Sequence, residues 1–257
     1  MLRAGPFVVR STAPPSFANQ TVVHHAKRRR TTGARSPLLA ERLLGTRSGS
    51  DACPDLFLRS GRGVVIRLSS CVTISDLYVR SCQSKGREII FADDGGNALS
   101  GDRALDISLR FAGALNSLGA QQPGDVVAFL CLGSATHAVA WFGTVVGGRV
   151  ACNLHIRGET VERIAEALDW VGAKVLVHDS DLSKIATEAI KATGRSIVRV
   201  ALSDDSPDTN SFYSLVSQQQ AIDYAANRPA PDVLGAIALS SGSTGKPKGV
   251  IHSQYSL

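Results

Sequence analysis

The chain has 257 residues, of which 44% are hydrophobic, so it can bury one large core or two small ones. It contains no apolar run of about eighteen residues, which argues against a membrane-spanning helix. Aromatic residues make up only 5% of the chain, which gives little support to a base-stacking surface for single-stranded nucleic acid.

The net charge of +6 comes from the N-terminal segment. Residues 1–50 hold nine of the 28 Lys and Arg residues and a single acid, Glu41, so they carry +8 and the remainder carries −2. This composition is typical of a disordered extension or of a mitochondrial transit peptide, and the basic run Lys27–Arg30 also resembles a nucleic-acid or nuclear-import patch. We expect residues 1–68 to form a basic, disordered extension. We expect a cytoplasmic protein, or a mitochondrial matrix protein if the extension is a transit peptide.

Residues 69–203 alternate between strand and helix patterns, because apolar runs are followed by segments with apolar residues at helical spacing. The predicted strands are Glu88–Ala92, Asp125–Leu132, Val150–Leu154, Lys174–His178 and Ser196–Leu202. The predicted helices are Asp102–Leu118, Ser134–Val146, Glu159–Trp170 and Asp181–Lys191, with Ser134 as a cap and Gly119 in a C-capping position. Repeated strand–helix–strand units require a mostly parallel, layered sheet with helices on both faces, which is an α/β fold.

The acidic, turn-rich run Asp204–Asn210 predicts a loop after this subdomain. We therefore expect 69–203 to form one α/β subdomain and 204–232 to form a linker. We expect 233–257 to begin a second subdomain.

The chain has five cysteines, an odd number with no C-x-x-C spacing. This predicts neither a disulfide framework nor a zinc site, and it fits a reducing compartment. The cysteines are Cys53, Cys71, Cys82, Cys131 and Cys152.

The most informative segment is Leu239–Val250 (LSSGSTGKPKGV), which follows the strand-like run Val233–Leu239. Its three glycines allow the backbone to approach a ligand closely, and successive N–H groups in such a turn form an anion-binding concavity. Its four hydroxyl side chains and two lysines suit phosphate oxygens. The pattern predicts a phosphate-binding loop between two strands, with a flexible surface hairpin as the alternative.

Two other phosphate loops are excluded. A Walker loop would need glycine at Ser240 and a hydroxyl residue at Pro247. The dinucleotide fingerprint G-x-G-x-x-G is absent, because Gly242 and Gly245 are separated by two residues. A dehydrogenase-like binding domain is therefore not supported.

Ser240–Gly249 resembles the [ST]-S-G-[ST]-T-G-x-P-K-G signature of the adenylate-forming (AMP-binding) superfamily, which includes acyl-CoA synthetases. The resemblance extends back to about Val72, through landmarks at Leu118-Gly119, Pro123–Val127 and Gly172–Val177. It implies that the chain is the N-terminal part of an enzyme that activates a fatty or other organic acid with ATP. The acid would become an acyl-adenylate and then an acyl-CoA.

The resemblance also implies roles for the loop residues. Lys248 would stabilise the departing pyrophosphate, while the hydroxyls of Ser243 and Thr244 and the backbone at Gly242 and Gly245 would hold the β- and γ-phosphates. The residues expected to bind the nucleotide are Ser240, Ser241, Gly242, Ser243, Thr244, Gly245, Lys246 and Gly249. ATP with Mg²⁺ and the acceptor CoA are implied, although we identify no residue of this chain as a metal ligand.

Several other polar residues have two interpretations. His155 and Arg157 follow a strand, where α/β sheets bind ligands, or they lie in a solvated loop; His252 is a substrate neighbour or a surface residue. We expect His137 to be partly buried and hydrogen-bonded rather than catalytic. We expect a solvated helix face from Glu159, Glu162, Arg163 and Glu166.

Family members continue well beyond this loop, with a Thr-Glu motif for Mg²⁺, a ribose-binding aspartate and a late lysine that are not among these residues. We therefore expect the chain to be a fragment that is inactive alone. The alternative is a truncated, non-catalytic relative that acts at most as a weak nucleotide-binding or interaction module. The acid, the thiol acceptor and the oligomeric state stay open.

Overall fold

The computed structural model of the chain describes residues 7–8, 56–59, 65–68, 72–155, 159–203, 210–240 and 248–257. The helices are α1 (Ile74–Lys85), α2 (Gly101–Ser117), α3 (Ala135–Val146), α4 (Val161–Val171), η1 (Ser180–Leu182, a 3₁₀ turn), α5 (Ser183–Thr193), α6 (Phe212–Gln218) and α7 (Tyr224–Asn227). The strands are β1 (Phe7–Val8), β2 (Leu56–Arg59), β3 (Val65–Leu68), β4 (Ile89–Ala92), β5 (Ala98–Ser100), β6 (Val126–Leu130), β7 (Val150–Asn153), β8 (Ala173–His178), β9 (Val198–Ala201), β10 (Asn210–Ser211), β11 (Leu234–Ser240) and β12 (Lys248–Ser253).

The largest sheet has seven strands in the order β10-β9-β8-β6-β7-β11-β12. Every neighbouring pair in it is parallel except β11 and β12, which are antiparallel. The predicted α/β fold with a mostly parallel sheet is therefore confirmed. Smaller sheets are formed by β1-β4-β5 and by β2-β3.

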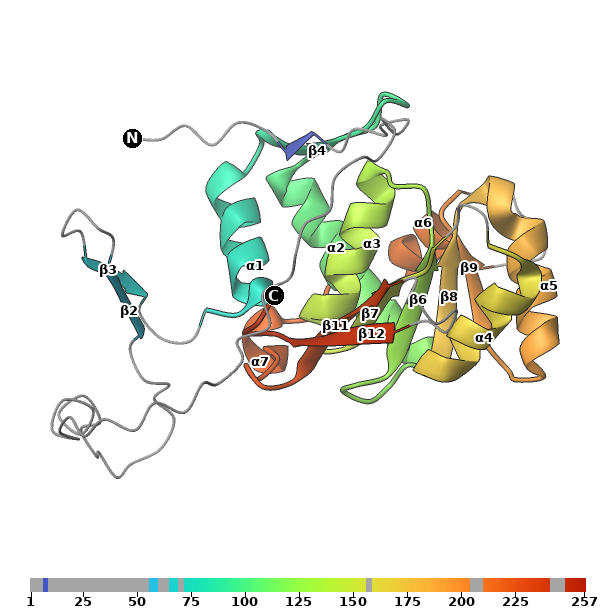
Figure 1. Ribbon diagram of the computed structural model, residues 1–257. Coiled ribbons are helices and arrows are strands. Elements are labelled where there is room, and N and C mark those ends of the chain that lie inside the picture. Colours follow the sequence, from blue (N-terminus) through green and yellow to red (C-terminus); the bar gives the residue numbers. More distant parts are fainter. Residues whose placement is uncertain are drawn as a thin grey trace, which may run out of the picture.

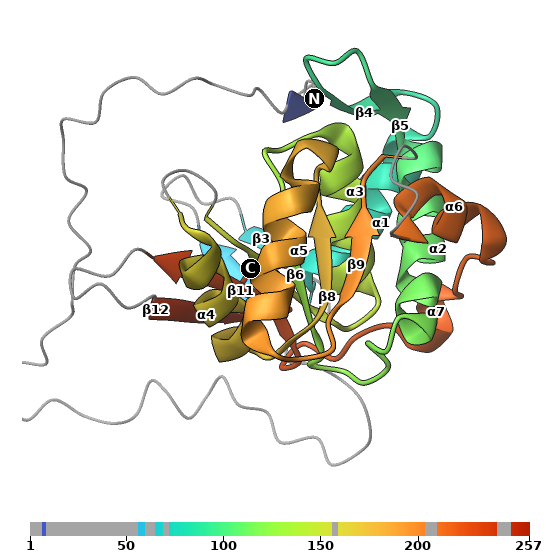
Figure 2. The same cartoon turned by 90° about the vertical axis from the view of Figure 1, so that its right-hand side faces the viewer.

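Helices cover both faces of the large sheet (Figures 1 and 2). All residues of β6 are buried, and they alternate between two cores. Val127 and Phe129 face the core formed with α1, α2, α3 and α6, whereas Ala128 and Leu130 face the core formed with α4 and α5. This two-sided burial explains why β6 reads in the sequence as one continuous apolar run.

Capping residues define where the predicted helices begin and end. The side chain of Ser134 accepts a hydrogen bond from His137 N at the start of α3, as its position predicted. Gly119 follows α2 with a φ of 86°, a conformation that glycine adopts without strain. The helix predicted at Glu159–Trp170 begins two residues later, at Val161, because Thr160 caps it by accepting from Arg163 N.

Helix α1 was not predicted. Its buried face carries polar residues, Ser75 and Asp76, beside Tyr78 and Cys82, so the apolar periodicity is weak. The signal that identifies it is the capping box Thr73-x-x-Asp76, in which each side chain accepts from the other residue's backbone N–H.

Residues 204–232, which we predicted as a linker, contain β10, α6 and α7. Strands β11 and β12, which we expected to begin a second subdomain, extend the large sheet: Ala236 pairs with Ala151 and Ile237 with Cys152 of β7. Within the predicted extension 1–68, β1 pairs with β4, and β2 pairs with β3. The division of the chain into domains stays a prediction.

Among the described helices, none is long and apolar enough to cross a lipid bilayer.

Candidate functional site

The predicted phosphate loop connects β11 to β12 at one edge of the sheet. Strand β11 runs parallel to β7, so the carboxyl ends of the two strands lie at the same edge. In open α/β sheets, ligands bind outside the carboxyl ends of the strands. The predicted nucleotide-binding residues Ser241, Gly242, Ser243, Thr244, Gly245 and Lys246 lie outside the described residues. The structure does describe the two arms that hold this loop.

Ser240 and Lys248 form the last pair of the hairpin before the loop. The Ser240 hydroxyl donates a hydrogen bond to the Lys248 carbonyl oxygen over 3.3 Å, and both residues are exposed. The hairpin thus brings Ser240 and Lys248 to its open end, one on each strand.

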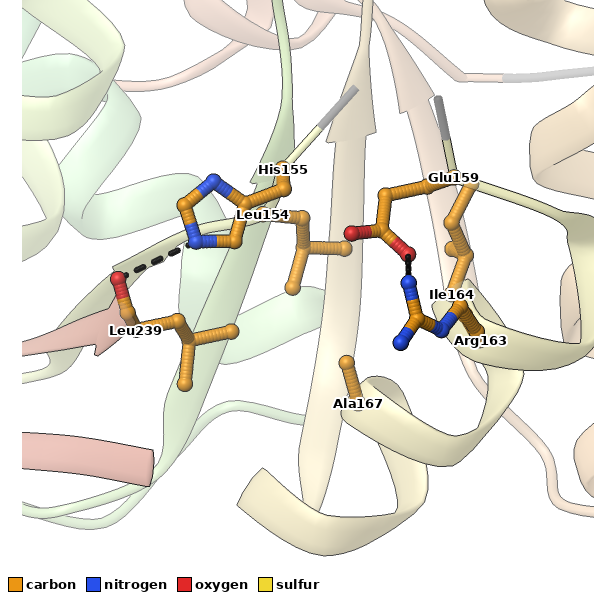
Figure 3. Close-up of a pocket in the computed structure, with 7 residues that line it drawn as sticks. All are labelled: Leu154, His155, Glu159, Arg163, Ile164, Ala167 and Leu239. Carbon is orange, nitrogen blue, oxygen red and sulfur yellow. Dashed lines mark hydrogen bonds and ion pairs between the residues drawn. The ribbon is translucent and has the colours of Figure 1, made fainter. Parts of the chain in front are cut away.

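His155 follows β7 and supports the first arm. Its ring Nε2 donates to the carbonyl oxygen of Leu239 over 3.1 Å (Figure 3). Because Leu239 immediately precedes Ser240, this hydrogen bond fixes the backbone where the loop begins. The side chain that we considered as a ligand or a solvated residue is exposed but has a partner in the hairpin; Arg157 lies outside the described residues.

A small groove lies beside this arm, between α4 and the ends of β7 and β11 (Figure 3). Its empty volume is about 280 Å³. It has apolar walls and a polar rim, and it is lined by Leu154, His155, Glu159, Arg163, Ile164, Ala167 and Leu239. An ion pair of 3.6 Å joins Glu159 to Arg163 on the rim, and Glu162 and Glu166 are exposed. The predicted solvated helix face is confirmed for Glu162, Arg163 and Glu166. It is wrong for Glu159, which lies before the Thr160 cap and whose side chain is only 19% exposed.

His252 lies away from the open end of the hairpin. His252 pairs with Ala236, four residues before Ser240 along β11. His137 is partly buried and its Nε2 donates to Asn153 Oδ1 over 3.3 Å, as predicted. Burial lowers the pKa of His137, so it favours the neutral imidazole.

Two features of the site were missed from the sequence. Asp179, directly after β8, accepts a hydrogen bond from Leu132 N over 2.6 Å and so joins the carboxyl ends of β6 and β8. Trp170 of α4 lies against Gly249 of β12, where an added Cβ would come within 2.5 Å of the ring atom Cη2. An acid just after a parallel strand is a usable sequence signal. No sequence signal predicts the contact between Trp170 and Gly249, because the two residues are 79 positions apart.

The groups at the hairpin suit phosphate better than a metal ion. Hydroxyl and ammonium groups donate to phosphate oxygens, whereas Mg²⁺ prefers carboxylate and carbonyl oxygens. Within the described ranges, no three His, Cys, Asp or Glu side chains lie close enough to hold a metal. We therefore derive no step through a metal ion.

Comparisons with known proteins agree on one family. A family model described as AMP-binding enzyme matches residues 79–257. Malformin synthetase mlfA of Aspergillus sclerotiicarbonarius is 29% identical over 172 residues, which cover 66% of this chain and 3% of that synthetase. Fumosorinone synthetase of Cordyceps fumosorosea is 26% identical over 200 residues, which cover 78% of this chain and 4% of that synthetase.

Solved structures share the fold at low sequence identity. An anthranilate CoA ligase, AuaEII, in complex with anthranoyl-AMP matches with a TM-score of 0.65 at 19% identity, over 72% of this chain and 35% of that chain. A benzoate CoA ligase from Burkholderia xenovorans matches with a TM-score of 0.61 at 18% identity, over 71% and 35% of the two chains. The chain thus spans about a third of these ligases and a much smaller part of the synthetases.

Proposed function

The chain belongs to the AMP-binding enzyme family, and from this premise we propose that it serves the activation of a carboxylic acid by ATP. The observation that carries the proposal is the β11–β12 hairpin, which presents Ser240 and Lys248 at the carboxyl edge of the sheet on either side of a Ser/Thr/Gly loop. The anthranoyl-AMP in the anthranilate CoA ligase structure supports an acyl-adenylate as the intermediate class.

The proposed reaction has two steps. A carboxylate oxygen attacks the α-phosphorus of ATP, the bond from this phosphorus to the bridging oxygen breaks, and pyrophosphate leaves with the electron pair. The thiol of coenzyme A then loses its proton to solvent and its sulfur attacks the acyl carbon. The bond from this carbon to the phosphate oxygen breaks, and AMP leaves with the electron pair. Mg²⁺ would accompany the nucleotide and offset its phosphate charge.

Each loop residue has a proposed part in the first step. Ser241 to Gly245 wrap the β- and γ-phosphates, with hydroxyl donors at Ser243 and Thr244 and backbone N–H donors at Gly242 and Gly245. Lys248 supplies positive charge where negative charge develops on the leaving pyrophosphate. Ser240, Lys246 and Gly249 complete the nucleotide-binding set.

The direct test is equilibrium dialysis of the chain against labelled Mg·ATP, with competitors. If the loop binds β- and γ-phosphates, inorganic tripolyphosphate displaces ATP and adenosine does not. Displacement by adenosine alone, or no ATP binding, would overturn the proposal.

A second assay separates an enzyme from a binding module. Because catalysis needs the acid, the α-phosphate and the metal positioned together, we propose that these 257 residues bind ATP without acid-dependent ATP–pyrophosphate exchange. Exchange by the pure chain with a panel of carboxylic acids would show that the described fold already completes the site. We place the protein in the cytoplasm, or in the mitochondrial matrix if residues 1–68 act as a transit peptide.

A further inference from the structure

Trp170 of α4 lies against Gly249 in the second arm of the hairpin. An ideal Cβ at Gly249 would lie 2.5 Å from Trp170 Cη2, 2.8 Å from Trp170 Cζ3 and 3.1 Å from Ile237 Cγ2. Non-bonded carbon atoms prefer separations of roughly 3.5–4.0 Å. The six-membered ring of Trp170 therefore occupies the space that any side chain at position 249 would need.

The backbone gives no separate reason for glycine at this position. Gly249 is not among the described glycines with positive φ, so its conformation is open to other residues. It pairs with Leu239 and directly follows Lys248, inside a regular antiparallel ladder. A side chain at position 249 would therefore have to displace the tip of the indole ring, which belongs to a 57% exposed side chain.

Helix α4 is a firm support for this contact. It is held to the core by buried Ile164 and Leu168, begins at the Thr160 cap and ends at Gly172, which adopts the left-handed conformation. In contrast, β12 is the edge strand of the sheet and pairs there only with β11. The ring of Trp170 lies against Gly249 of this edge strand, directly after Lys248.

We propose that Trp170 is a positioning residue, which holds the β12 arm so that Lys248 keeps its place opposite Ser240. The proposal rests on the proposed function, since it assigns Trp170 to the nucleotide site. Trp170 would act without touching the nucleotide, by reducing the freedom that the arm loses when phosphate binds. His155 holds the β11 arm in a similar way, through its hydrogen bond to the carbonyl oxygen of Leu239.

The test measures Mg·ATP affinity by equilibrium dialysis for Trp170→Ala, Trp170→Phe and a control, Leu77→Ala. Leu77 is on α1 and is 50% exposed, against 57% for Trp170, so the control removes a similarly exposed apolar group elsewhere. We expect Trp170→Ala to bind ATP about fivefold more weakly, the size of a typical coupling between contacting residues. Trp170→Phe, which keeps a ring, should restore most of the affinity, and Leu77→Ala should leave it unchanged.

A double-variant cycle tests the contact itself. Gly249→Ala should also weaken ATP binding, because the new methyl group collides with the ring and displaces the arm. In Gly249→Ala/Trp170→Ala the collision with the ring is gone and only the milder contact with Ile237 Cγ2 at 3.1 Å stays, so the double variant should bind about as well as Trp170→Ala alone. Independent, multiplying losses would overturn the proposal.

A spectroscopic readout uses the two tryptophans of the chain. In a Trp141→Phe variant, tryptophan fluorescence comes from Trp170 alone. Titration with Mg·ATP should change this fluorescence, and the fitted dissociation constant should equal the one found by dialysis. If the wild-type chain binds ATP but Trp170→Ala binds it equally well, the positioning role is wrong and the proposed function stands. If the wild-type chain binds no ATP, the proposed function itself is wrong.

Discussion

Of the two lysines of the predicted phosphate loop, the structure describes Lys248. It begins β12 opposite Ser240, and its side chain is exposed at the open end of the hairpin. The sequence motif singled out both residues through its resemblance to a family signature, which needs no tertiary information, and their part in nucleotide binding stays a prediction. Trp170 and His155 reach the hairpin from α4 and β7, so their roles depend on the fold.

Lys248→Ala should weaken Mg·ATP binding by about tenfold, because a charge-assisted hydrogen bond to phosphate is lost. Equilibrium dialysis measures this, and Lys174→Ala, an exposed lysine on β8, is the matched control. Lys248→Arg keeps the charge and should lose less affinity than Lys248→Ala. Equal affinity in Lys248→Ala and the wild type would remove Lys248 from the site.

At the scale of elements, α1 is joined to α7 by an ionic cluster. Buried Asp76 accepts hydrogen bonds from Arg228 Nε at 2.8 Å, Arg228 Nη2 at 2.7 Å and Tyr224 Oη at 2.9 Å. It also accepts one from Thr73 N at 3.0 Å. Burial alone would raise the pKa of Asp76, but the hydrogen bonds from Arg228, Thr73 and Tyr224 outweigh it and lower this pKa well below 3.8.

Asp76→Asn should therefore lower the free energy of unfolding by about 2 kcal/mol at neutral pH, because a buried acceptor of several hydrogen bonds loses its charge. The pKa is depressed in the folded state, so the wild type gains stability above pH 4 and loses it as the pH falls further. Urea unfolding at pH 7 and at a pH below 4 measures the free energies of unfolding of the wild type and Asp76→Asn. The difference between the two should be smaller at the lower pH. Asp94→Asn, at an exposed turn residue, is the control; a gap that does not depend on pH would contradict the assignment.

Element positions followed well from the sequence where hydrophobic periodicity was strong, as in β6, α2 and β8. Hydrophobic periodicity failed to predict helices whose buried faces are polar or which are short. Helix α1 buries polar Ser75 and Asp76, which are satisfied by Gln254 and Arg228, residues more than 150 positions away. Helices α6 and α7 are short and lie in a segment whose turn-rich start suggested a linker.

For the whole molecule, the buried residues of the two cores lie between Tyr78 and Val216. Partly buried residues outside this range pack against the cores, namely Ile74, Ile222, Tyr224, Ile237 and Leu239. From the N-terminal 68 residues, β1 contributes a two-residue pairing with β4. The sequence predicted the parallel α/β architecture but not the place of β11 beside β7. That pairing joins residues 85 positions apart, such as Ala236 and Ala151, and no local pattern specifies it.

Deletion of residues 1–68 should leave the cooperative thermal unfolding transition nearly unchanged, since the described cores lie outside this segment. Circular dichroism melting of the shortened and complete chains compares them directly. A fall in the melting temperature of more than about 5 °C, which corresponds to roughly 1–2 kcal/mol for a domain of this size, would show that the segment is part of the folded unit.

A second cavity is an alternative binding place for a ligand, away from the open end of the hairpin. It has an empty volume of about 890 Å³ and lies near the amino end of β7, lined among others by Asn116, Gly148, Arg149 and Arg228. Arg149 donates there to the carbonyl oxygen of Ala120 over 3.0 Å and to that of Gln121 over 3.3 Å. This cavity and the open end of the hairpin lie at opposite ends of the parallel strands, so one experiment can distinguish them.

The most direct measurement is a titration of the ¹⁵N-labelled chain with Mg·ATP, followed by the backbone amide signals. The proposed phosphate-binding hairpin predicts saturable shifts at Leu239, Ser240, Lys248 and Gly249, and unchanged signals at Gly148 and Arg149. Shifts confined to Gly148 and Arg149, or no shifts at all, would contradict the account.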